Sequence, residues 1–175
     1  MDTRTNYCDS DVYHLPFSSN SFDFVLSHYF FLWLKHPAIA CQEILRILKP
    51  GGFLVALAEP DYEARIDSPE EMERMGKLQT QSLVNQGINP KIGRQLPYIL
   101  HKSGFQDVQY GISGYQDALQ NNQKWIESEW QVLRNDLQSL TSEETITNFI
   151  KQDQIFREKC SRLFWLPTFY IYGKK

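Results

Sequence analysis

The apolar and polar positions in the first third of the chain change from a strand-like to a helix-like pattern and back. Residues 22–27 (FDFVLS) are rich in strand formers and follow a turn-like polar stretch. A helix is predicted from Pro37, because proline suits a first helical turn and apolar residues then recur at helical spacing. The residues KPGG at 49–52 end this helix, and 53–58 form an unbroken apolar run. This order predicts a right-handed βαβ unit whose parallel strands are buried on both faces.

Two helices and a strand are predicted in the middle of the chain. A capping box at 68–71 opens a helix that should end near Gly87. Apolar residues line one face of a second helix, which begins after Pro90 and is closed by Gly104. The alternation in 105–110 predicts a strand.

The last third of the chain predicts a helical hairpin and then a strand. Apolar residues between Ile126 and Leu140 step by four and three, which gives a helix with an apolar seam. A second capping box at 141–144 opens the partner helix, and the β-branched and aromatic residues 164–172 predict the final strand. We therefore expect an α/β protein with one domain over residues 1–175, in which about 117–162 are inserted as a helical cap.

Composition and charge argue against several partners. The chain has 175 residues, of which 42% are hydrophobic, and a formal net charge of -3. It contains no basic run longer than Lys174-Lys175, so no nucleic acid is expected as a partner. The longest near-apolar stretch, 22–34, is interrupted by Asp23 and His28 and is too short to span a bilayer. Because the first residues are also polar, we expect no signal peptide, no membrane partner and a cytoplasmic location.

The cysteines give no sign of a metal or disulfide site. The chain has three cysteines, which is an odd number: Cys8, Cys41 and Cys160. They lie far apart in the sequence and form no CxxC pair. Reduced thiols are therefore expected, and no metal ligands.

Polar residues follow both predicted parallel strands. Ser27, His28 and Tyr29 come after the first strand, Glu59 to Tyr62 come after the second, and Asp11 closes a third strand predicted near Cys8. Ligands of open α/β sheets bind beyond the carboxyl ends of the strands, so a ligand crevice is expected there. A plainer interpretation stays open, in which Glu59 and Asp61 only open a turn and His28 is an ordinary edge histidine.

Three stretches of the chain resemble class I S-adenosylmethionine-dependent methyltransferases. They are DVYHLPF at 11–17, SFDFV at 21–25 and EILRILKPGG at 43–52. The family pattern reads acid-x-x-x-Leu-Pro-Phe, Ser-Phe-Asp and Arg-x-Leu-Lys-Pro-Gly-Gly, in this order. The resemblance implies a Rossmann-like methyltransferase sheet, with an inserted helical hairpin cap before a last strand that runs antiparallel.

The resemblance also implies a cofactor and its site. Asp11 matches the acid that accepts a hydrogen bond from the adenine amino group, and Val12 supplies the neighbouring amide and packs near the adenine. Ser27 and His28 match positions that line the methionine and sulfonium part of S-adenosylmethionine. The implied reaction is methyl transfer to a small-molecule acceptor, through an O, N or C atom.

Two sets of residues are candidates for the acceptor side of the site. If the acceptor must lose a proton, the base is one of His28, Asp61 and Tyr62, and the sequence does not separate them. Four aromatic residues of the cap either line an acceptor pocket or belong to the core: Trp125, Trp130, Phe164 and Trp165.

The chain departs from the family pattern at its start. The family's Gly-x-Gly loop and the acid that holds the ribose hydroxyls lie upstream of the position of Asp11, and only ten residues precede Asp11 here. The nine glycines of the chain form no Gly-x-Gly. The resemblance therefore implies a sheet that is truncated at the N-terminus, with 22–27 as an exposed edge through which a homodimer could form.

Two functions stay open. The first is S-adenosylmethionine-dependent methyl transfer. The second is a non-catalytic methyltransferase-like remnant that acts as a protein-interaction or dimerisation module. A dinucleotide-dependent dehydrogenase is less favoured, because no Gly-x-Gly-x-x-Gly follows a predicted strand.

Overall fold

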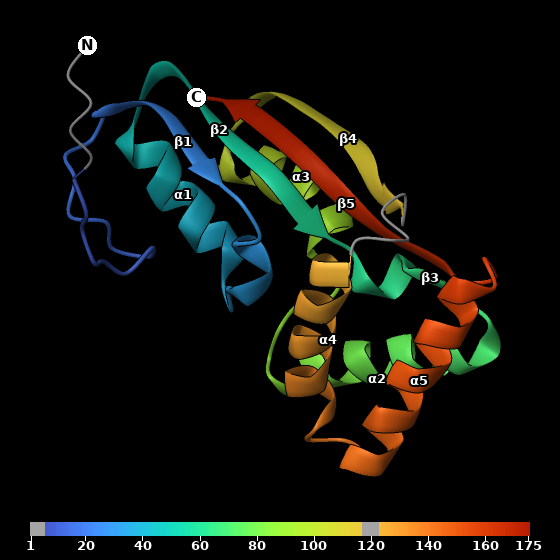
Figure 1. Cartoon of the computed structure of the whole chain (residues 1–175). Helices are drawn as coiled ribbons and strands as arrows, with labels where there is room; N and C mark the ends of the chain where they lie inside the picture. Colours follow the sequence, from blue (N-terminus) through green and yellow to red (C-terminus); the bar gives the residue numbers. More distant parts are fainter. Residues whose placement is uncertain (1–5, 117–122) are drawn as a thin grey trace.

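The predicted βαβ unit forms the first half of the fold. The structure is a computed structural model that describes residues 6–116 and 123–175 (Figure 1). The unit consists of β1 (Phe22–Ser27), α1 (Pro37–Ile47) and β2 (Leu48–Pro60), and its two strands run parallel. Residues 49–52 do end the helix, but they are already extended, so β2 begins earlier than predicted. A Cβ at Gly52 would lie 2.8 Å from the Asp23 carbonyl oxygen, and this close approach of the two strands explains the glycine.

The sheet is completed by strands from the second half of the chain. β5 (Leu163–Lys174) is antiparallel to β2, as expected for the last strand. β4 (Gln106–Gln116) and the short β3 (Ile66–Ser68) both pair antiparallel with β5. β1 therefore lies at one edge of the five-stranded sheet, and β4 lies at the other side (Figure 1). The α/β fold with a closing antiparallel strand is confirmed.

One face of the sheet carries the main hydrophobic core. α1 and α3 (Ile92–Ser103) pack together on this face, over the fully buried Leu54, Ala56 and Ile171. Gly104 ends α3 in the left-handed region at φ 106°, as its sequence position predicts. Local sequence signals and burial agree in this part of the fold.

The opposite face of the sheet is open over the described residues. Residues opposite each other in a sheet point to the same side, so the pairing of Leu26, Val55 and Tyr172 identifies this face. Phe24 and Leu26 are 61% and 64% exposed, and the prediction that the parallel strands are buried on both faces is therefore wrong for β1. We call this surface the open face; its exposed apolar side chains are Phe24, Leu26, Leu57, Tyr170 and Tyr172.

Three helices gather beyond one end of the sheet (Figure 1). They are α2 (Glu70–Asn85), α4 (Gln123–Leu137) and α5 (Glu143–Glu158). Their apolar sides form a second core, made of Met72, Met75, Trp130, Leu133, Leu137, Ile146 and Phe149. The predicted hairpin therefore shares its core with α2, and we call the three helices the cap. Residues 117–122, where the insertion was predicted to begin, and the side chain of Trp125 lie outside the described residues.

Several local predictions differ from the structure. Ser68 belongs to β3 and Pro69 precedes α2 without a side-chain cap, so the first capping box does not form. α5 is capped by Ser142 instead of Thr141, with the Ser142 hydroxyl accepting from the Thr145 amide at 3.2 Å. Within residues 6–20 the structure has no strand, so the third strand predicted to end at Asp11 is wrong for the described part of that segment.

Two short 3-10 helices lie near the ends of the parallel strands: η1 (Phe31–Trp33) follows β1 and η2 (Tyr62–Ala64) follows β2.

Among the described residues, no helix is both long and apolar enough to cross a bilayer. The same part of the chain contains no cluster of three His, Cys, Asp or Glu side chains that could hold a metal ion.

Candidate functional site

The segment that carries Asp11 is held against α1 by hydrogen bonds from its backbone to a salt-bridged pair of that helix. Glu43 and Arg46 lie one turn apart, and the Arg46 Nη2 to Glu43 Oε1 distance is 2.7 Å. Glu43 accepts from the Leu15 amide at 2.9 Å, while Arg46 donates to the carbonyls of Leu15 at 3.0 Å and Phe17 at 2.8 Å. The acid and arginine of the 43–52 motif thus position the Leu-Pro-Phe turn.

Asp11 stands exposed at the start of this turn. Its Oδ1 accepts from the Tyr13 amide at 2.9 Å, and its Oδ2 lies 3.4 Å from His14 Nδ1. The hydrogen bond from the Tyr13 amide, reinforced by His14, lowers the pKa of the Asp11 carboxyl, which is therefore ionised at neutral pH. Val12 is half-buried next to it. The carboxylate faces solvent with further capacity to accept hydrogen bonds.

Three consecutive residues at the end of β1 have different environments. The hydroxyl oxygen of Ser27 is buried and has no hydrogen-bond partner among the described residues. His28 is exposed, with its ring 5.0 Å from that of Tyr29. Tyr29 adopts φ 49°, a left-handed conformation that costs a non-glycine residue about 1–2 kcal/mol. Its amide donates to the Ala58 carbonyl at 2.9 Å, which holds it in this conformation.

Glu59, at the end of β2, fixes the loop that follows β1. Its Oε1 accepts from the amides of Phe30 at 3.1 Å and Phe31 at 3.2 Å. Its Oε2 is buried with no partner among the residues that the structure describes. Burial raises the pKa of this carboxyl, against the effect of the amides. Glu59 therefore determines where His28 and Tyr29 stand.

Asp61 is fully buried and its carboxylate is already engaged. Both oxygens meet the guanidinium of Arg94, with Nη2 2.8 Å from Oδ1, and Oδ1 also accepts from the Ala64 amide at 3.1 Å. This places Asp61 at the base of η2 as a cap and ion-pair partner. Of the three candidate bases, His28 is exposed and Asp61 is engaged. Burial raises the pKa of the Tyr62 hydroxyl, so this group lines the cap pocket as a protonated phenol and is a poor base.

A pocket of about 330 Å³ lies between the ends of the parallel strands and the cap. We call it the cap pocket. Its lining combines residues from the strand ends, the cap and β5: Tyr29, Tyr62, Arg65, Gln79, Ser128, Glu129, Val132, Leu133, Phe164 and Leu166. Of the aromatic candidates, Phe164 lines this pocket, and Trp130 belongs to the cap core and also lines a separate hollow of about 400 Å³ between α4 and α5.

Glu129 brings an unusual carboxylate to the cap pocket. Burial raises its pKa to about 7, and the nearby Arg157 and Arg65 limit the rise. No hydrogen bond or ion pair of this carboxylate is found within residues 6–116 and 123–175. The sequence pattern does not single out Glu129, because the residues that form its pocket lie far apart in the chain.

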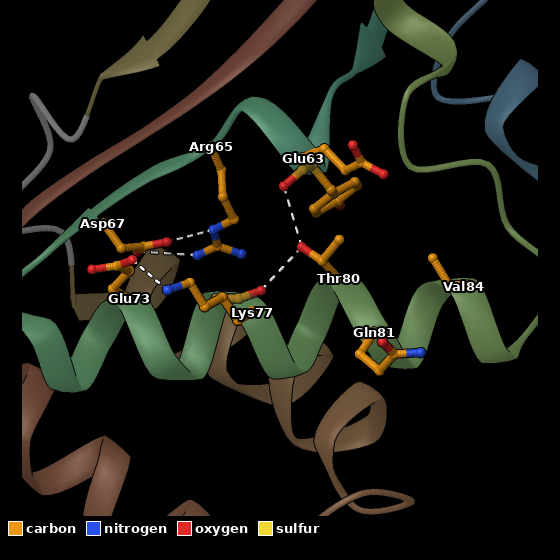
Figure 2. A pocket seen from close by; sticks show the side chains of 10 residues that line it. Glu63, Arg65, Asp67, Glu73, Lys77, Thr80, Gln81 and Val84 are labelled. Carbon is orange, nitrogen blue, oxygen red and sulfur yellow. Dashed lines mark hydrogen bonds and ion pairs between the residues drawn. The ribbon is translucent and has the colours of Figure 1, made fainter.

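A second hollow of about 460 Å³ runs along α2 (Figure 2). Its charged side chains already pair with one another. Arg65 Nε lies 2.6 Å from Asp67 Oδ2, and Lys77 Nζ lies 2.5 Å from Glu73 Oε1. Thr80 donates to the Tyr62 carbonyl at 3.2 Å, an interaction that ties α2 to η2. The side chains of this hollow connect α2 to the strand ends and already pair with one another. The cap pocket is therefore the better ligand site.

Comparison with known proteins agrees with this architecture. Residues 2–56 match the family model described as a methyltransferase domain. An uncharacterized methyltransferase of Schizosaccharomyces pombe is 34% identical over 129 residues, which cover 70% of this chain and 46% of that protein. The chain thus spans less than half the length of this relative.

Solved structures share the fold at low sequence identity. A methyltransferase from Archaeoglobus fulgidus that depends on S-adenosylmethionine superposes with a TM-score of 0.54 at 16% identity, over 99% of this chain and 69% of that one. Phosphoethanolamine N-methyltransferase 2 of Haemonchus contortus, in complex with phosphomonomethylethanolamine and S-adenosylhomocysteine, gives 0.53 at 17% identity, over 94% and 36%. The fold is therefore the Rossmann-like fold of methyltransferases. This fold, the match of residues 2–56 to a methyltransferase domain and the similarity to the S. pombe methyltransferase are consistent with the class I S-adenosylmethionine-dependent methyltransferases that the sequence motifs resemble.

Proposed function

We propose that the chain takes part in S-adenosylmethionine-dependent methyl transfer to a small molecule, with the acceptor in the cap pocket. The observation that carries this proposal is the position of the cap pocket. It opens at the carboxyl ends of β1 and β2, where ligands of open α/β sheets bind, and residues that follow both strands line it. S-adenosylmethionine, when bound, would supply an electrophilic methyl group to the acceptor.

The residues present fit one side of this cofactor. Asp11 offers an exposed, ionised carboxylate to the adenine amino group, and Val12 lies beside it. The buried, unpartnered hydroxyl of Ser27 and the exposed His28 stand at the end of β1. These residues would bind and orient the cofactor. If the acceptor must lose a proton, the exposed His28 is the best candidate among His28, Asp61 and Tyr62, because Arg94 engages Asp61 and burial raises the pKa of Tyr62.

We expect the chain alone to bind S-adenosylhomocysteine weakly. The sequence has no Gly-x-Gly loop, and two hydrogen bonds that the ribose hydroxyls donate to a carboxylate are worth roughly 3–6 kcal/mol together. A dissociation constant of about 1 μM would accordingly rise to about 0.1–10 mM, a range that ligand-observed NMR measures. Asp11→Ala should weaken binding about tenfold or more, because it removes a charged hydrogen-bond acceptor.

Asp9→Ala is the matched control for Asp11→Ala, since Asp9 is exposed in the same segment. It should leave the dissociation constant of S-adenosylhomocysteine unchanged. Equal binding by the wild type and Asp11→Ala would remove Asp11 from the cofactor site. No binding by the wild type at 10 mM ligand would contradict the whole proposal for this chain.

A second candidate function is that of an interaction module, and the open face favours it. β1 is an edge strand, and four of the five apolar side chains of the open face have exposures between 45% and 64%. Exposed apolar surface next to an unpaired strand edge is typical of a protein-protein contact. A homodimer is the simplest partner for such a surface, and its test is developed in the Discussion.

A further inference from the structure

The outer edge of β1 carries backbone groups that face away from the sheet. β1 pairs with β2 and, among the described residues, with no other strand. The Tyr29 amide donates to the Ala58 carbonyl of β2 at 2.9 Å, and the Ser21 amide donates at 2.7 Å to the residue just before β2. Backbone groups alternate in direction along a strand, and both of these donors have odd residue numbers. The amides and carbonyls of Phe24 and Leu26 therefore point to the open edge.

This edge lacks the features that usually keep a strand edge unpaired. Protected edges are commonly very short, bulged, or occupied by lysine or proline. β1 contains neither residue type, and its pairing with β2 is regular from Phe24 to Ser27. Its one charged residue, Asp23, is already paired with Lys49 at 2.8 Å. Phe24 and Leu26 are also the most exposed of the five apolar side chains of the open face. We therefore expect this edge to pair with a further strand.

The sequence of β1 is complementary to itself in the antiparallel direction. With a two-fold axis at Val25, Phe24 lies opposite Leu26 of the second copy, and Leu26 lies opposite its Phe24. The outward backbone groups of these residues then form hydrogen-bonded pairs, and Val25 faces its own copy in a non-hydrogen-bonded pair. Asp23 lies opposite Ser27 of the second copy, so no like charges face each other.

Other registers use this edge less well. An axis at Phe24 pairs Leu26 with Phe22, where the pairing of β1 with β2 is irregular. An axis at Leu26 pairs Phe24 with His28, which lies beyond the end of β1. An axis between two residues sets outward backbone groups against inward ones and breaks the hydrogen-bond pattern. The register with its axis at Val25 is therefore favoured.

We propose that two copies of this chain pair antiparallel through β1 around Val25, so that the sheet continues from one copy into the other. The inference rests on the interaction-module function, because it names the partner of the open face and the contact between the copies. Phe24 and Leu26, which are 61% and 64% exposed, then pack against Leu26 and Phe24 of the second copy. Stacking of the two open faces would instead leave the outward backbone groups of β1 unpaired.

A disulfide cross-link at Val25 tests this arrangement. Val25 and its copy would have Cα atoms about 4.5 Å apart, within the range that a disulfide bridges. In a background of Cys8→Ser and Cys160→Ser, which removes the exposed thiols, Val25→Cys should form a covalent dimer with oxidised glutathione. Cys41 is buried and can remain. Non-reducing gel electrophoresis and intact mass measure the product.

Two matched cysteine variants separate this arrangement from others. Phe24→Cys would lie about 8 Å from its copy, which is offset by two residues along the strand, and should not cross-link. Leu57→Cys lies on the open face in β2, so it should cross-link only if the open faces stack. Cross-linking of Leu57→Cys without Val25→Cys would overturn the proposal, as would equal cross-linking of Phe24→Cys and Val25→Cys.

Hydrogen exchange of the wild-type chain covers the case in which Val25→Cys fails to fold. Because only the monomer would expose the amides of Phe24 and Leu26, their exchange should slow about tenfold when roughly nine-tenths of the chains are dimeric. Unchanged exchange of both amides in a dimeric sample would refute the edge pairing and leave the interaction-module function standing. A monomer at every concentration would contradict both. Neither experiment uses S-adenosylhomocysteine, so the cofactor titration succeeds or fails separately.

Discussion

Asp153→Ala is expected to lower the free energy of unfolding by about 3–5 kcal/mol, because it removes the acid that two buried arginines share. Asp153 is 2% exposed. It accepts from Arg157 Nε at 2.8 Å, Arg162 Nε at 2.9 Å and Trp130 Nε1 at 2.9 Å. The variant would leave the indole donor unsatisfied and remove the carboxylate that both guanidinium groups contact. Urea unfolding of the wild type and the variant measures the difference.

The matched control for Asp153→Ala is Arg134→Ala. Arg134 and Glu143 form an ion pair between α4 and α5 that is exposed to solvent, and such pairs contribute little. A change of less than about 1 kcal/mol is expected for this variant. If Asp153→Ala cost no more than Arg134→Ala, the buried network would not stabilise the cap. Asp153→Asn keeps the shape of the side chain and should fall between the two.

Self-association of the wild-type chain, and its loss in Leu26→Lys, is the second large effect that we expect. Leu26 is 64% exposed in the edge strand β1 and lies beside Phe24 on the open face. Burial of a leucine in an interface stabilises a complex by about 1.5–3 kcal/mol, and a buried unpaired lysine would add a desolvation cost. The dissociation constant of the dimer should therefore rise at least tenfold, or about 1.4 kcal/mol. Sedimentation equilibrium over a range of protein concentrations measures it.

Ile39→Lys provides the comparison for Leu26→Lys. Ile39 is 48% exposed on α1, away from the open face, so its replacement adds the same charge elsewhere. It should leave the dimer intact. A monomeric wild type at all concentrations would contradict the interaction-module function. Equal effects of the two variants would mean that association depends on net charge instead of the open face.

Local patterns predicted most elements but few of their contacts. Residues 22–27 are a strand with the predicted boundaries, and the helix from Pro37 ends at the KPGG stretch. The first capping box failed because Ser68 pairs with Leu163 across the sheet, and a strand pairing outweighed the local capping signal. The prediction that β1 is buried on both faces was wrong for a related reason. Which helices cover a face depends on contacts between distant segments.

The candidate site shows the same division. Asp61 was a plausible base from its place after an apolar strand, but Arg94 from α3 occupies its carboxylate. Glu59 also follows that strand, and the structure gives it the amides of the β1 loop. Glu129 was missed because its pocket is built from segments that are far apart in the chain, including Tyr29 and Phe164.

The sequence by itself determined the α/β class, the parallel unit of β1 and β2 and the methyltransferase motifs around Asp11 and residues 43–52. These features depend on periodicity, on proline and glycine at helix ends and on residues close together in the chain. Only the tertiary structure decided that Asp61 is engaged, that one sheet face is open and that Glu129 reaches the cap pocket without a described partner. Burial and ion pairing arise when distant segments pack together, and such contacts leave no periodic trace in the sequence.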